Sequence, residues 1–139
     1  MVITETKLDE SFSAANFEID GFHSPYVFNR SLNGGGIMVF VRDDFFSKEL
    51  HMHKSCFSAD IEGIFIEINL RKTKWLLFAT YHPPSQNIEH FLRNISLGLD
   101  KYSPNYEQII LVGDFNIEEH IAKMSDFNAI FFKKFGQFT

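Results

Sequence analysis

The sequence predicts a layered α/β or α+β fold in a single domain, for three reasons. Apolar segments with the two-residue alternation of β-strands recur along the chain, most clearly over residues 62–70. Between two such segments, over residues 87–102, the apolar period becomes that of an amphipathic helix. With 139 residues and 45% hydrophobic composition, the chain is large enough for one core and too apolar to be disordered.

The predicted elements come as hairpins followed by a helical crossover. Glycines at residues 34–36 suit a tight turn between the first two full strands, and residues 71–74 form the turn of a second hairpin. Pro83-Pro84 ends that hairpin because proline cannot donate to a strand ladder. Asn87 is a suitable N-cap for the helix that follows. Strands are expected at residues 26–30, 36–42, 47–53, 62–70, 75–81 and 108–112, and helices at 87–102 and 123–135.

Charge and cysteine content exclude several classes of protein. A net charge of −5 and a pI near 5.6 argue against a broad polyanion-binding surface, although a local metal site could still bind a phosphodiester. The single cysteine, Cys56, rules out an intramolecular disulfide framework and a cysteine-rich zinc site. No apolar run approaches the roughly 20 residues of a membrane helix, and no signal peptide is recognisable at the start. The expected protein is intracellular and unsecreted, with no membrane partner.

Polar side chains with chemical potential follow three predicted strands. Asp114 and Asn116 come directly after the strand at 108–112, and on their own they could simply end it, because Asp and Asn readily bond to their own backbone. Glu5 follows the short apolar stretch at the N-terminus, and Tyr81 closes the strand at 75–81. Strand ends are where layered α/β proteins tend to carry their chemistry, so the combination favours an active site.

A series of motifs supports this interpretation, and its order resembles that of the endonuclease/exonuclease/phosphatase superfamily. Within that superfamily the closest resemblance is to the endonuclease domains of LINE-type non-LTR retrotransposons. Each motif is weak alone, but their order and spacing along nearly the whole chain make the set specific. In this sequence the motifs lie at residues 4–9, 19–22, 30 with 34–42, 62–68, 75–77 with 81–84, and 111–117.

The resemblance implies a four-layer α/β/β/α sandwich that nicks DNA with Mg²⁺, or alternatively Mn²⁺, and leaves a primer for reverse transcription in the nucleus. It implies that Glu5 holds the metal, in keeping with the one or two carboxylates that Mg²⁺ usually takes. Asp114 would orient the attacking water and take its proton. Asn116 would donate an amide N–H to the phosphate, and Tyr81 would donate its hydroxyl to a nonbridging or leaving oxygen.

Parts of the family pattern have no counterpart in this sequence. These are an Asn on the first strand, a later Asp/Asn pair, and a terminal Ser-Asp-His, which Ser125-Asp126-Phe127 imitates without the histidine. We therefore expect residues 1–139 to be a partial domain of this type, with little or no nicking activity of its own. An incomplete sheet would also expose apolar surface and favour self-association. A non-enzymatic retrotransposon-derived remnant, and a phosphatase or RNA nuclease of the same superfamily, remain alternatives.

The histidines carry less weight. His51 and His53 would share one face of a strand, but no third metal ligand is evident, so an exposed strand is the preferred interpretation. His82 is expected to face away from any site that contains Tyr81, because neighbouring strand residues alternate. His120 is expected in a solvated loop.

Overall fold

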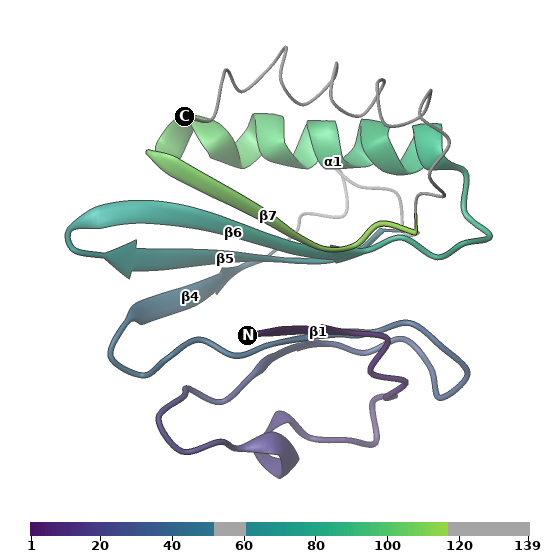
Figure 1. Ribbon diagram of the computed structural model, residues 1–139, viewed down its shortest axis with the longest axis horizontal. Coiled ribbons are helices and arrows are strands. Elements are labelled where there is room, and N and C mark those ends of the chain that lie inside the picture. Colours follow the sequence, from purple (N-terminus) through teal and green to yellow (C-terminus); the bar gives the residue numbers. More distant parts are fainter. Residues whose placement is uncertain (52–60, 117–139) are drawn as a thin grey trace.

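The structure, a computed structural model, describes residues 1–51 and 61–116. These residues form two β-sheets and one long helix, stacked as three layers (Figure 1). The predicted mixture of helix and sheet in layers is therefore confirmed. The predicted helix over residues 123–135 lies outside the described residues.

A small antiparallel sheet contains three short strands in the order β1-β3-β2. Its central strand pairs residue for residue with both neighbours, so that Met38 faces Ile3 on one side and Val27 on the other. The pairing of Val27 with Met38 belongs to the predicted hairpin around the glycines at residues 34–36. The strands are β1 (Val2–Thr4), β2 (Tyr26–Phe28) and β3 (Ile37–Val39).

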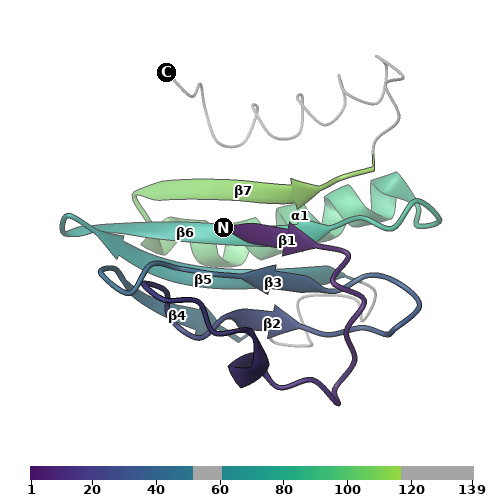
Figure 2. The ribbon, with the colours of Figure 1, turned by 60° about the horizontal axis from the view of Figure 1, so that its bottom comes forward.

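A larger sheet forms the middle layer and has the order β4-β5-β6-β7. Its first three strands are antiparallel, while β6 and β7 are parallel and are connected through the helix α1 (Ile88–Tyr102). Figure 2 shows the small sheet lying over the larger one, with β1 and β7 pointing the same way. The strands of this sheet are β4 (Phe46–Leu50), β5 (Glu62–Leu70), β6 (Thr73–Tyr81) and β7 (Gln108–Asp114).

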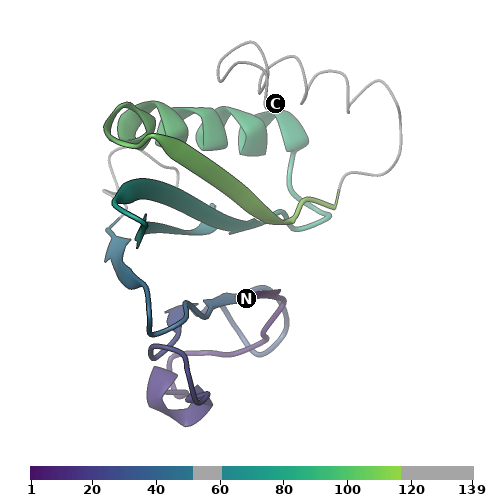
Figure 3. The same ribbon diagram turned by 60° about the vertical axis from the view of Figure 1, so that its left-hand side comes forward.

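Two hydrophobic cores hold the layers together, one on each face of the larger sheet. Figure 3 shows the larger sheet between α1 and the small sheet. Ile64 and Ile66 of β5 point into the core between the two sheets, whereas Phe65 points into the core beneath α1. The ring of Phe65 stacks on Phe78 of β6, with ring centroids 3.9 Å apart. The larger sheet is thus buried on both faces, which explains why β5 carries apolar residues outside its strict alternation.

Several boundaries differ from the prediction for local reasons. The hairpin between β5 and β6 turns within Arg71 and Lys72, both with positive φ, so β6 begins at Thr73 rather than at residue 75. Strand β7 extends two residues beyond the predicted end, to Asp114. The strands β2 and β3 are shorter than predicted, and a 3₁₀ helix, η1 (Ala14–Phe17), was not predicted.

Helix α1 begins where its cap was predicted. The side chain of Asn87 accepts a hydrogen bond from the backbone N–H of His90 at 3.1 Å, which satisfies one of the unpaired donors of the first turn. No helix among residues 1–51 and 61–116 is both long enough and apolar enough to cross a membrane.

Candidate active site

Three strand ends meet at one edge of the two-sheet stack. Tyr81, the last residue of β6, lies opposite Asp114, the last residue of β7, in the parallel register. The Tyr81 hydroxyl donates a hydrogen bond of 2.5 Å to Oε1 of Glu5, which follows β1 in the other sheet. The structure therefore brings together the side chains of Glu5, Tyr81 and Asp114, with Asn116 two residues beyond. We call these four residues the candidate edge.

The Tyr81 phenol is buried and surrounded by acidic groups. Burial, the hydrogen bond to Glu5 and the negative charges of Glu5, Glu62 and Asp114 together raise the pKa of Tyr81 to about 12. The phenol therefore keeps its proton at neutral pH. It can act as a hydrogen-bond donor at this edge, and not as a base or a nucleophile.

The backbone holds Glu5 in an unusual conformation. Glu5 has a φ of 54°, in the left-handed region that residues with a side chain rarely adopt. Two hydrogen bonds just beyond it, from Thr6 N–H to Gly36 O at 3.4 Å and from Lys7 N–H to Gly35 O at 3.0 Å, tie this segment to the glycine-rich loop. Such sustained strain is common at functional sites, where surrounding contacts over-determine it. In this conformation the Glu5 carboxylate reaches Tyr81 at the end of β6.

Asp114 and Asn116 show the local bonding that ends a strand. The backbone N–H of Asn116 donates to Oδ1 of Asp114 at 3.0 Å, and the Asn116 side-chain amide donates to the backbone oxygen of His82 at 2.8 Å. The strand-ending interpretation thus describes the local geometry correctly. One carboxylate oxygen takes no part in this bonding: among the described residues, Oδ2 of exposed Asp114 has no hydrogen-bond partner.

Gly113 fixes the path of β7 immediately before Asp114. Strand β7 approaches β6 so closely there that a Cβ on Gly113 would lie 1.7 Å from the Thr80 carbonyl oxygen. Only glycine fits this position without moving one of the two strands. The glycine in the motif before Asp114 is therefore a requirement for placing that carboxylate beside Tyr81.

His82 has a role that the sequence did not predict. Its buried ring packs on Phe91 of α1 and places one nitrogen 2.8 Å from Phe115 O and the other 3.0 Å from Gln86 O. Tyr81 points into the core between the sheets, so the prediction that the two side chains face opposite ways is confirmed. The ring holds the segment that carries Asn116 against the start of α1. The alternation of side chains along a strand predicted which way His82 points, but not which backbone oxygens its ring contacts.

The carboxylates at this edge suit a hard divalent cation with few protein ligands. Three of them influence Tyr81, but Glu62 is already engaged by Arg30 at 2.5 Å and by the backbone N–H of Gly36 at 2.9 Å. Glu5 and Asp114 are therefore the two carboxylates that could bind a cation here. Mg²⁺ commonly binds through one or two carboxylates and several waters. The described parts of the chain contain no cluster of three or more His, Cys, Asp or Glu side chains arranged to hold a metal. The residues present therefore fit Mg²⁺ better than a metal that needs a full protein shell.

The other sequence candidates do not join this edge. Strand β4 ends at Leu50, and exposed His51 accepts a hydrogen bond at its backbone oxygen from the Tyr102 hydroxyl at 2.9 Å. The residues that lie outside the described ranges are His53, Cys56, His120 and Ser125-Asp126-Phe127.

Comparisons with protein-family models and with curated protein sequences find no match to this chain.

Proposed function

We propose that this chain is a Mg²⁺-dependent phosphodiester hydrolase domain of the endonuclease/exonuclease/phosphatase type, and that it is related to the DNA endonucleases of LINE-type retrotransposons. The contact that carries the proposal is the hydrogen bond between Tyr81 and Glu5, which are 76 residues apart and belong to different sheets. The family resemblance implies that both residues belong to one active site. The same proposal includes the fold: the complete domain would have the four-layer α/β/β/α sandwich of that superfamily.

Glu5, Asp114 and Tyr81 share three tasks in this proposal: metal binding, activation of water and donation of a hydrogen bond. Glu5 and Asp114 supply oxygen ligands for Mg²⁺ and its waters, and the bound ion would neutralise charge on the phosphate. Asp114, exposed at the end of β7, orients a water for in-line attack and accepts its proton. The Tyr81 hydroxyl has one proton, which it donates to Glu5 in this structure; with Glu5 bound to Mg²⁺, it would donate that hydrogen bond to a phosphate oxygen instead.

Asn116 has two amide N–H groups, and one of them is donated to the His82 backbone oxygen. That bond orients the amide and leaves its second N–H for a phosphate oxygen. Positioning by fixed neighbours is what phosphoryl transfer requires, because the protein contributes mainly alignment and charge stabilisation.

Residues 1–139 alone are expected to have low activity, because they hold only part of the family's catalytic set. The sequence has no counterpart for the first-strand Asn or for the phosphate-contacting His of the family pattern. Groups that act as one catalytic unit are strongly non-additive, so one missing member can remove most of the rate. This observation favours one second candidate, a retrotransposon-derived remnant that keeps the edge residues without catalysis. A phosphatase or RNA nuclease would use the same metal chemistry.

The test is a nicking assay on supercoiled plasmid with Mg²⁺, using the chain and its Asp114→Ala variant. We expect slow conversion to open circles that disappears in the variant and in the presence of EDTA. Asp44→Ala is the matched control, because Asp44 is an exposed carboxylate paired with Arg42 on the loop that follows β3. Equal rates for the chain and Asp114→Ala would show that the nicking comes from a contaminant. No nicking by a folded chain that binds Mg²⁺ would favour the remnant.

A further inference from the structure

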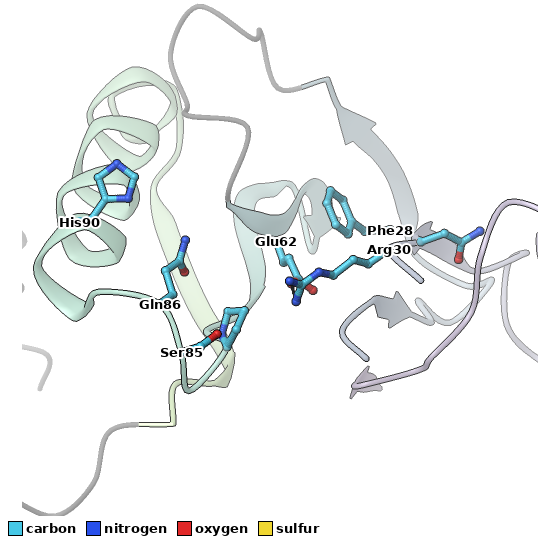
Figure 4. Close-up of a pocket in the computed structure, with 8 residues that line it drawn as sticks. Phe28, Arg30, Glu62, Ser85, Gln86 and His90 are labelled. Carbon is cyan, nitrogen blue, oxygen red and sulfur yellow. Dashed lines mark hydrogen bonds and ion pairs between the residues drawn. The ribbon is translucent and has the colours of Figure 1, made fainter. Parts of the chain in front are cut away.

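A pocket opens beside the candidate edge and is not used by the proposed chemistry. It has a volume of about 510 Å³, within the ~300–1,000 Å³ range of small-molecule sites. One wall comes from the β2 end and the start of β5, and the other from the loop after β6 and the first turn of α1 (Figure 4). The residues labelled there are Phe28, Arg30, Glu62, Ser85, Gln86 and His90.

The pocket lies next to the proposed reaction centre, where the start of β5 pairs with the end of β6. Glu62, the first residue of β5, lies directly opposite Tyr81 in the antiparallel register. Pro83, two residues after Tyr81, is part of the pocket wall. A nucleic-acid strand whose scissile phosphate lies at Tyr81 would therefore pass this pocket with an adjacent nucleotide.

Arg30 is the residue in the pocket wall that carries a permanent positive charge. Its side chain is 48% exposed, and its guanidinium donates through Nη1 to Oε1 of Glu62 at 2.5 Å. A guanidinium has five N–H donors in a planar fork, and among the described residues this one has no partner other than Glu62. The remaining donors suit a phosphate, which Arg binds through two parallel hydrogen bonds.

The surrounding residues hold Arg30 in place. Glu62 is 5% exposed and also accepts the Gly36 N–H at 2.9 Å, so the anchor of the guanidinium is itself fixed. A Cβ on Gly35 would lie 2.5 Å from both the Arg30 Cδ and Oε2 of Glu62, and Gly35 has a φ of +77°. The glycine-rich loop thus packs directly on the ion pair. A guanidinium held this way loses little conformational freedom when it binds a ligand.

We propose that this pocket is a nucleotide subsite, in which Arg30 binds the phosphate that neighbours the scissile one on the substrate strand. The proposal rests on the proposed function for the identity of the strand, and it adds a contact that the edge residues do not make. The opposite wall, with Ser85 and His90, offers further polar groups to the same nucleotide. Glu62 keeps Arg30 in position and does not touch the strand.

Binding can be measured without catalysis by fluorescence anisotropy of a labelled single-stranded oligonucleotide in EDTA, over a series of salt concentrations. The diagnostic variant is the double substitution Arg30→Gln with Glu62→Gln, which keeps the net charge constant and leaves no buried unpaired carboxylate. The matched control is Arg42→Gln with Asp44→Asn, which neutralises an exposed Arg–carboxylate pair with an Nη2–Oδ2 distance of 3.0 Å. Arg42 follows β3, at the opposite end of that strand from Gly36.

We expect the Arg30 double variant to bind about tenfold more weakly and to lose about 0.7 units of the slope of log affinity against log salt, as for one lost phosphate contact on a single strand. The Arg42 double variant should match the unaltered chain. Equal affinities and slopes for both double variants would overturn the subsite. If the Arg30 double variant does not fold, Arg30→Lys takes its place, because it keeps the positive charge beside Glu62 and removes the forked donors of the guanidinium. Severalfold weaker binding by this variant supports the proposal. Unchanged binding overturns it.

This experiment separates the subsite from the proposed function. Binding that depends on Arg30 in a chain that never nicks would keep the subsite and reject the hydrolase. Nicking that depends on Asp114, with binding indifferent to Arg30, would keep the hydrolase and reject the subsite.

Discussion

At the scale of single residues, the environment of Tyr81 defines the candidate edge most clearly. Its hydroxyl joins two sheets through Glu5, and three carboxylates act on it; among the described residues, only Glu62 of the three has an ion-pair partner. The environment holds a proton donor next to unneutralised negative charge. That arrangement suits a phosphate bound through a cation, because the cation offsets the carboxylates and the phenol donates to the phosphate.

The first prediction concerns the loss of this hydroxyl. Tyr81→Phe should lower the free energy of unfolding by about 0.5–1.5 kcal/mol, the usual net value of one hydrogen bond, and should weaken Mn²⁺ binding by less than Asp114→Ala does. Tyr26→Phe is the control, because the Tyr26 hydroxyl bonds to Ser47 at 2.8 Å, away from the edge. Urea unfolding and metal titration measure the two effects. A larger loss of stability in the Tyr26 variant, with no change of metal affinity in either, would contradict the account.

The second prediction is a pH dependence. The pKa of Tyr81 is raised from 10.0 to about 12 in the folded chain, so the unfolded chain releases this proton first as the pH rises. The stabilisation is fully present below pH 10 and is lost between about pH 10 and about pH 12. Burial and the hydrogen bond to Glu67 also raise the pKa of Tyr106, so the difference between the chain and Tyr81→Phe isolates Tyr81. Urea unfolding across this range should show a shallower decline for the variant, and identical slopes would argue against a buried phenol.

At the scale of elements, close contacts between neighbouring segments position the edge residues. His82 links the end of β7 to the start of α1, and Gly113 allows β7 to approach β6. The hairpin β5–β6 was predictable, because its alternation and its prolines are local signals. The pairing of β1 with β3, and the contact of Glu5 with Tyr81, depend on residues far apart in the chain. No local pattern encodes such contacts, and only the family resemblance anticipated that these side chains meet.

The third prediction tests the link through His82. His82→Phe keeps a ring beside Phe91 but removes both contacts to backbone oxygens, so the segment at Asn116 should open more often. We expect amide exchange at Asn116 to accelerate about tenfold, equivalent to about 1.4 kcal/mol. His90→Phe, the same substitution at an exposed position in the first turn of α1, is the control. Unchanged protection of Asn116 would mean that His82 only fills the core.

The fourth prediction concerns Gly113. Gly113→Ala should prevent β7 from pairing with β6 at Thr80 and abolish cooperative unfolding, because the added Cβ meets a carbonyl oxygen 1.7 Å away. Gly21→Ala separates this clash from backbone strain: Gly21 has a φ of +81° but open space around it, so the cost should stay near ~1 kcal/mol. Thermal unfolding followed by circular dichroism compares the two. A cooperative transition in the Gly113 variant would show that the strands can separate without loss of the fold.

At the scale of the whole molecule, both sheets present an unpaired edge in the part of the chain that the structure describes. The edge strands β1 and β7 carry exposed Ile3 and Ile110. Unpaired edges with apolar side chains favour pairing with another chain. Layering and class were predictable because hydrophobic period and length constrain them. The place of β1 at an edge was not predictable, because its three residues give no periodic signal.

The fifth prediction is that the chain self-associates through β7. Ile110→Lys should shift the population towards monomer in light scattering after size exclusion, because a charged edge resists pairing. Leu97→Lys places the same charge at a similarly exposed position, 47% against 37%, on the helix and should leave the distribution unchanged. A monomeric unaltered chain at high concentration would contradict this prediction.

The most direct test of the central claim is to titrate Mn²⁺ into the isotopically labelled chain and to follow paramagnetic broadening of its backbone amides. The account predicts broadening centred on Glu5, Tyr81 and Asp114, competed away by Mg²⁺ and lost in Asp114→Ala but kept in Asp44→Ala. Broadening elsewhere, or none at the candidate edge in a folded chain, would contradict the proposal that this edge is a metal site for phosphodiester chemistry.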